Sequence, residues 1–218
     1  MSPAAQELRN KLKAEFDVGR KAFHDSMTTT QTHIDVAGAD LARLRANLKT
    51  QAAATRAATG LRVEELTRML DAARDEQQGK IEDYLTTLQR DMGSLNAELK
   101  SATAGERADL EVTAKAMRKE WDSTRAALTA SLEAELSELK ERIGSVRAAA
   151  AGTREAAKTT VRTRTADLHA KSEVAQKRLH ALKQAGEAAF NEIHHGARAA
   201  MIDLRIAVER ARADIHAA

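Results

Sequence analysis

Large apolar side chains recur every three or four residues along almost the whole chain, from Leu8 to Ile215. This spacing places them on one face of an α-helix, whereas no useful length of the chain alternates apolar and polar residues as a half-buried strand does. The average step along this apolar stripe is about 3.63 residues, between a straight helix and an eleven-residue repeat. A left-handed coiled coil needs a shorter step. We therefore expect helices that pack straight or with a slight right-handed twist.

The stripe thins at three places, and we interpret each as a tight turn: 52–60, 101–109 and 148–158. Each place contains glycine and threonine, which commonly end and begin helices. Thr103 and Glu106 have the spacing of a capping box, and Gly152-Thr153 fits a helix end followed by a new start. The turns divide the chain into four helices, at roughly 4–57, 61–102, 106–150 and 154–217.

Two local features leave alternatives open. The alanine run before Gly152 favours helix, so one longer helix through the third place is the alternative to a turn there. The segment SMTTTQTH at 26–33 is a poor helix former, and a break in the first helix is expected at this segment if anywhere.

The predicted fold is all-α: an elongated antiparallel bundle of about four long amphipathic helices with coiled-coil-like packing, forming a single domain over 1–218. Amphipathic helices gain most of their stability from packing, and folding back lets the chain bury its own stripe. The composition agrees, with one proline, 2% aromatic and 31% charged residues. All five aromatic residues lie on the stripe and are expected in the core: Phe16, Phe23, Tyr84, Trp121 and Phe190.

Near its C-terminus the chain repeats with a period of eleven residues. The first column of this repeat is apolar and forms a candidate interaction stripe: Leu182, Ile193, Leu204 and Ile215. A basic column follows it, comprising Lys183, His194, Arg205 and His216, and an acidic column precedes it, comprising Glu192, Asp203 and Asp214. Helices on lipid usually carry Lys and Arg around the apolar face. Opposite charges on the two edges instead suit a helix flanked by other helices.

Charge differs between the predicted helices, because 1–60 and 153–218 are net +3 and +4 while 61–105 and 106–152 are net −3 and −1. This favours pairing of the first helix with the second and of the third with the fourth. The stretch 153–183 is net +5 and is the candidate anion-binding patch, with Arg154, Lys158, Arg162, Arg164, Lys171, Lys177, Arg178 and Lys183. It has no aromatic residue to stack on bases. A solvated face paired with the third helix is the competing interpretation.

No residue pattern points to catalysis. The chain has no cysteine, no glycine-rich phosphate loop and no nucleophile-elbow motif, so neither an enzyme nor a cofactor is expected. Glu192 and His195 have the Glu-x-x-His spacing of di-iron bundles, but such sites need two copies of the motif and the chain has one. No metal site is expected.

Two further absences bear on location. Charged residues near the N-terminus occupy the place where a signal peptide needs an apolar core. No run of about 18 apolar residues predicts a membrane span. Together with the lack of cysteine, these features lead us to expect a cytoplasmic protein.

These features favour a non-catalytic helical scaffold or protein-interaction module that forms a homo-oligomer or binds another helical protein. In period, scarcity of aromatic residues and length, the chain also resembles exchangeable apolipoproteins and proteins that coat granules or droplets. That resemblance implies the alternative function, an amphipathic protein on a lipid or peripheral membrane surface. A third interpretation is non-specific nucleic-acid binding through 153–183, suggested by its charge and by a pI near 9.2.

Overall fold

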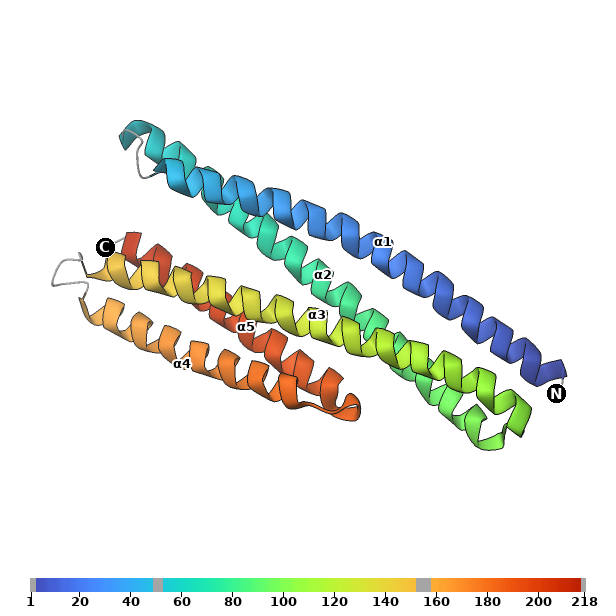
Figure 1. Cartoon of the computed structure of the whole chain (residues 1–218). Coiled ribbons are helices and arrows are strands. Elements are labelled where there is room, and N and C mark those ends of the chain that lie inside the picture. Colours follow the sequence, from blue (N-terminus) through green and yellow to red (C-terminus); the bar gives the residue numbers. More distant parts are fainter. Residues whose placement is uncertain (1–2, 49–52, 152–157, 217–218) are drawn as a thin grey trace. The chain divides into compact units, whose positions relative to one another are not determined.

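The computed structural model describes residues 3–48, 53–151 and 158–216. These residues form five helices and no strand (Figure 1). The helices are α1 (Pro3–Leu48), α2 (Ala53–Ser101), α3 (Ala104–Ala150), α4 (Lys158–Gln184) and α5 (Glu187–His216). The prediction of an all-α fold is confirmed.

The boundary between the first two helices differs from the prediction. α1 ends at Leu48 and α2 begins at Ala53, so Gly60 lies inside α2 and not in a turn. One glycine inside a helix costs about 1 kcal/mol relative to alanine. The alanines before Gly60 favour helix strongly, which explains why this cost does not end α2.

The predicted last helix, 154–217, is instead two helices interrupted at Ala185 and Gly186. The backbone N–H of Ala185 donates to Leu182 O, and that of Ala189 donates to Gly186 O, both at 3.2 Å. These bonds span three residues, the tighter pattern common at helix ends. The break escaped prediction because the apolar period continues through it.

The threonine-rich segment 26–33 does not break α1, and the expectation of a break there is wrong. Thr28, Thr29, Thr30 and Thr32 each donate their hydroxyl to the backbone carbonyl four residues earlier, at 2.9 to 3.1 Å. Each hydroxyl is thereby satisfied within the helix and does not compete with the helical hydrogen bonds.

The turn between α2 and α3 follows the prediction closely. The backbone N–H and the hydroxyl of Thr103 both donate to Glu106 Oε2, at 2.9 and 2.7 Å. The carboxylate half of the predicted capping box is therefore formed. The other predicted helix end, Gly152-Thr153, lies outside the described residues.

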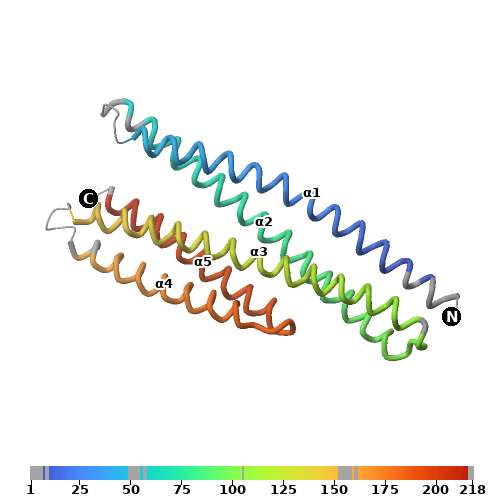
Figure 2. Tube along the Cα trace, in the orientation of Figure 1, coloured from blue at the N-terminus to red at the C-terminus, as the bar shows by residue number. Residues whose placement is uncertain are grey.

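The helices group into two compact units, Met1–Thr124 and Arg125–Ala218. The division falls within α3. The first unit contains α1, α2 and the beginning of α3; the second contains the rest of α3, α4 and α5 (Figure 2). Each unit therefore draws on three helices.

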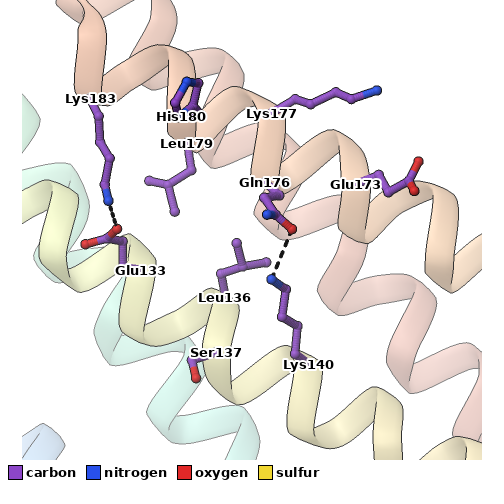
Figure 3. A pocket seen from close by; sticks show the side chains of 10 residues that line it. All are labelled: Glu133, Leu136, Ser137, Lys140, Glu173, Gln176, Lys177, Leu179, His180 and Lys183. Carbon is purple, nitrogen blue, oxygen red and sulfur yellow. Dashed lines mark hydrogen bonds and ion pairs between the residues drawn. The ribbon is translucent and has the colours of Figure 1, made fainter.

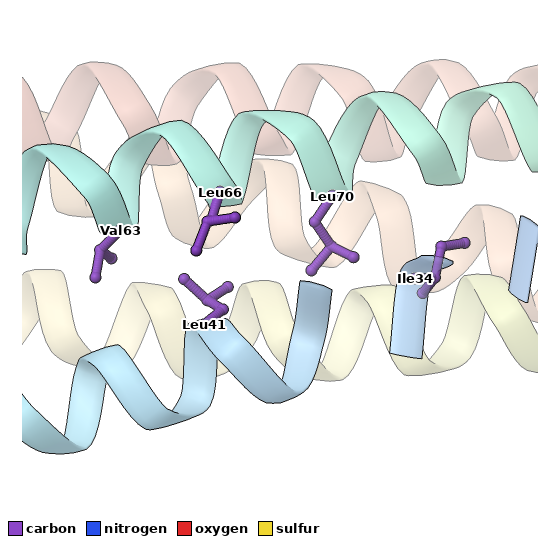
Figure 4. Packing of buried hydrophobic residues seen from close by; sticks show 5 residues of the cluster. All are labelled: Ile34, Leu41, Val63, Leu66 and Leu70. Atoms are coloured by element: carbon purple, nitrogen blue, oxygen red, sulfur yellow. The ribbon is translucent and has the colours of Figure 1, made fainter. Parts of the chain in front are cut away.

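In the first unit, α1 and α2 pack antiparallel through their apolar stripes. Ile34 and Leu41 of α1 lie among Val63, Leu66 and Leu70 of α2 (Figure 4), and all five are at most 8% exposed. Full burial of such a side chain contributes about 1.5–3 kcal/mol. The first helix thus packs against the second, as the charge pattern predicted.

In the second unit, α4 and α5 run antiparallel while α5 runs parallel to α3. The core of this unit is almost free of solvent contact: Leu128, Leu132, Leu139, Leu168, Leu182, Phe190, Leu204 and Val208 are each at most 2% exposed. Only Leu182 and Leu204 of this set belong to the apolar first column of the eleven-residue repeat; the others lie in its other columns or before the repeat begins. The stripe is therefore buried by helices of the same chain.

The predicted core positions of the aromatic residues are largely found. Phe16, Trp121 and Phe190 are at most 6% exposed. Phe23 and Tyr84 are half-buried, and their rings stack with centroids 4.0 Å apart. Along the described residues, no helix offers a stretch long and apolar enough to cross a membrane.

Candidate functional site

The basic column of the eleven-residue repeat contacts α3. Lys183 forms an ion pair with Glu133, and Arg205 forms one with Glu135. The second pair is withdrawn from water, because the side chains of Arg205 and Glu135 are 12% and 3% exposed. Removing either partner would leave an uncompensated buried charge, so the pair favours the register of α3 and α5 in which both partners meet.

The acidic column contacts α4 at one position, and the apolar column lies in the core. Asp214 Oδ2 accepts a hydrogen bond from Arg164 Nε at 2.6 Å. Packing within the chain buries the candidate interaction stripe in part. Leu182 and Leu204 are fully buried, and Ile193 and Ile215 are half-buried. Contacts with α3 and α4 therefore account for part of the basic, acidic and apolar columns of the repeat.

His194 occupies the basic column but behaves as a core residue. Its side chain is 1% exposed, and its ring lies nearly parallel to that of Phe190 with centroids 6.2 Å apart. Burial, aided by the nearby His195 and Arg198, lowers the pKa of His194 from 6.5 to about 4. At neutral pH the ring is uncharged and packs as an aromatic group.

Arg125 of α3 holds the turn between α4 and α5. Its Nη2 donates to the backbone carbonyls of Lys183, at 3.2 Å, and Ala185. Its guanidinium carbon lies 5.0 Å from the centre of the Phe190 ring. Carbonyls at the end of a helix lack partners within the helix and attract cations. Sequence reasoning missed Arg125, because nothing distinguishes it from the other arginines of its helix.

A further charged contact joins α3 to α5. Arg142 Nη2 lies 2.8 Å from Glu138 Oε1, and Arg142 Nη1 lies 4.0 Å from Glu209 Oε1. The Arg142 side chain is 10% exposed. With the pair formed by Glu135 and Arg205, this contact lines the α3–α5 interface with charges that have partners in the chain.

A groove of about 720 Å³ lies between α3 and α4 (Figure 3). The side chains of Leu136 and Leu179 point toward each other at its floor and are 5% and 6% exposed. Two polar contacts cross it, from Lys140 to Gln176 at 3.1 Å and from Lys183 to Glu133. The groove lies between two packed helices, and polar side chains of both helices bridge it.

The candidate anion-binding patch is only partly a free surface. Arg154 lies outside the described residues, as does the side chain of Lys158. Arg164 and Lys183 are paired with carboxylates. The guanidinium of Arg178 lies over Gly196, where an added Cβ would be 3.7 Å from Nη1.

Four members of the patch remain, because Arg178 is exposed although it lies over Gly196. Arg162 and Lys177 are exposed as well, and Lys171 is half-buried. They are spread along α4, with Asp167 and Glu173 between them. The structure therefore does not gather the predicted patch into one concentrated basic site among the described residues.

The single Glu-x-x-His motif lies on the solvent side of α5. Glu192 and His195 are both exposed. Within the described ranges, no three His, Asp or Glu side chains are placed to hold one metal ion.

Comparison of the chain with protein-family models, with curated proteins and with solved structures finds no significant match. Function is therefore inferred from this chain's own residues.

Proposed function

We propose that the protein is a non-catalytic helical scaffold in the cytoplasm that self-associates or binds another helical protein. One observation carries this proposal: the chain buries its apolar stripe on itself. Leu182 and Leu204 are fully buried in the second unit, and Leu41 and Leu70 are 2% exposed in the first. Helices that are already packed present rigid outer faces to a partner. The 3.63-residue spacing supports straight or slightly right-handed, coiled-coil-like packing.

The same observation weighs against the lipid-surface alternative. A helix that binds lipid inserts its apolar face among acyl chains. In the second unit that face is occupied by other helices, so binding lipid would require the unit to open. Opening would separate Arg205 from Glu135, a buried pair.

Nucleic-acid binding has less support than the scaffold function or the lipid-surface function. Non-specific binding depends on the number of phosphates that Lys and Arg neutralise. Arg164 and Lys183, two members of the basic stretch, are engaged with Asp214 and Glu133 of the same chain.

The test combines vesicle flotation with circular dichroism and sedimentation velocity on the purified protein. A scaffold is expected to be fully helical without lipid, to melt cooperatively, to stay in solution with anionic and neutral vesicles, and to increase in mass with concentration. Flotation with both vesicle types, accompanied by a gain of helix, would favour the lipid-surface function instead. Flotation with anionic vesicles alone, lost in high salt, would point to the 153–183 stretch.

A further inference from the structure

The face of α1 opposite its buried stripe carries a line of small side chains with apolar groups. Val18 and Val36 are 69% and 60% exposed. They are 18 residues apart, which is five helical turns, so both project in the same direction. Ala22, Thr29 and Thr32 are exposed and lie between them at helical spacing. We name this face the outer seam: Val18, Ala22, Asp25, Thr29, Thr32 and Val36.

The two threonines of the outer seam present methyl groups. Thr29 Oγ1 donates to Asp25 O at 3.1 Å, and Thr32 Oγ1 donates to Thr28 O at 2.9 Å. Because these hydroxyls are bonded to the helix itself, they need no hydrogen-bond partner from outside the helix. Threonine is also a less favourable helix residue than alanine.

We propose that the outer seam packs against the outer seam of a second copy, with the two α1 helices antiparallel. This inference rests on the self-association proposed above and names the surface that carries it. An alignment centred near Met27 places Val18 against the partner's Val36, and symmetry repeats this contact at the other end. Such a two-fold interface is closed and self-complementary, so it yields a dimer and not a filament.

Charge supports the antiparallel direction. Lys21 and Asp35 are exposed and lie on the same edge of the seam. Their midpoint is residue 28, beside the proposed centre, so Lys21 lies near the partner's Asp35 in both halves of the interface. Asp35 Oδ1 also accepts from Gln31 Nε2, one turn earlier on the same helix, at 2.8 Å.

A parallel pair is disfavoured by the residue in the middle of the seam. It would set Asp25 against the partner's Asp25, and apposed like charges destabilise helix pairs. The antiparallel pair instead sets Asp25 against the partner's Thr29. The same aspartate, together with Asp35, makes the seam a poor match for an anionic membrane.

Cysteine cross-linking tests the register directly, because the chain contains no cysteine. Val18→Cys and Val36→Cys proteins are prepared separately, distinguished by a size tag, mixed and oxidised. A disulfide between the two variants is expected in the mixture. Neither variant alone is expected to cross-link, because two copies of position 18 lie about 27 Å apart along the pair. Disulfides need Cα atoms within about 7 Å.

A matched control is Val112→Cys on α3, since Val112 is 70% exposed. It should not cross-link with Val18→Cys. Efficient cross-linking of each variant with itself, without the mixed product, would show a parallel pair and overturn the proposal.

Charge exchange provides the second measurement, by sedimentation velocity over a concentration series. Lys21→Asp and Asp35→Lys are each expected to raise the dimer dissociation constant about fivefold to tenfold, because two contacts become repulsive. The combined variant should restore it to within about twofold. These side chains are exposed, so circular dichroism melts should be unchanged.

The outcomes separate this inference from the proposed function. A wild-type protein that stays monomeric up to about 100 µM, an affinity too weak for a working dimer, would contradict both self-association and the seam. An oligomer that neither cross-links at these positions nor responds to charge exchange would contradict the seam alone. If the unchanged protein floats with vesicles and Val18→Lys abolishes this flotation, the outer seam binds lipid and the proposal is overturned.

Discussion

At the scale of single residues, His194 couples the stability of the second unit to pH. Its folded pKa, about 4, lies below its ordinary value of 6.5 because of burial. The unfolded chain therefore takes up a proton first as pH falls. The stability contributed by the neutral ring is complete above pH 6.5, falls between pH 6.5 and 4, and changes no further below that range.

We expect His194→Leu to remove this part of the pH dependence. The loss in the wild type amounts to roughly 2–3 kcal/mol in the free energy of unfolding between pH 7 and 4. Urea unfolding followed by circular dichroism at several pH values measures it. His180→Gln, at an exposed position on α4, is the control and should keep the wild-type slope. Parallel slopes for wild type and His194→Leu would contradict the assignment.

Arg125 is the second residue with a specific expected effect. Arg125→Ala should lower the free energy of unfolding by about 2–3 kcal/mol, because two carbonyls lose a charged donor and Phe190 loses a stacked guanidinium. Arg125→Lys should recover little, since an ammonium lacks the planar fork. Arg147→Ala, at an exposed site on the same helix, should cost under 0.5 kcal/mol in the same urea titration. Equal effects at the two sites would count against a stabilising role for the contacts that Arg125 makes with the turn between α4 and α5.

At the scale of helices, the sequence predicted correctly that the chain forms long helices. Two of the helix boundaries were predicted poorly. Apolar spacing identifies a helix but is blind to a short turn that preserves the spacing, as at Ala185 and Gly186. Conversely, Gly60 was interpreted as a turn although alanines around it sustain α2. Leu85 and Leu136 are also buried, and each lies four residues after one buried apolar residue and three before the next. Packing among three helices covers a wider face than one line of residues.

The sequence predicted that the charged edges of the repeat face other helices. It did not predict which residues of those helices would contact them. Spacing along one helix carries no information on the register of its neighbour. That register is set by contacts such as Glu135 with Arg205, which a sequence shows only as two charges far apart.

We expect this buried pair to behave unlike an exposed one in double-mutant cycles. Glu135→Leu or Arg205→Met alone should each cost about 3–5 kcal/mol, because one charge stays buried without its partner. Glu135→Leu combined with Arg205→Met should recover most of that loss. The exposed pair of Arg62 and Glu65 serves as comparison and should couple by less than about 1 kcal/mol. Additive losses at Glu135 and Arg205 would show that the pair does not couple α3 to α5.

At the scale of the whole molecule, the contacts form two compact units divided within α3, and the single domain over 1–218 stays a prediction. A stripe of constant period gives no sign of such a division, since each unit uses the same spacing. Only the pairing of distant helices reveals it. If the two units unfold separately, a substitution in the core of one unit should lower the stability of that unit and leave the other unchanged.

Leu204→Ala tests this consequence. Leu204 is fully buried in the second unit, and its truncation should cost about 2–5 kcal/mol there. Hydrogen exchange read by mass spectrometry should show lost protection in α4 and α5 while α1 and α2 keep theirs. Leu70→Ala, in the core of the first unit, is the reciprocal variant and should reverse the pattern. Equal loss of protection in all five helices from either change would mean that the chain unfolds as one cooperative domain, because a helix shared by both units then transmits the loss from one core to the other.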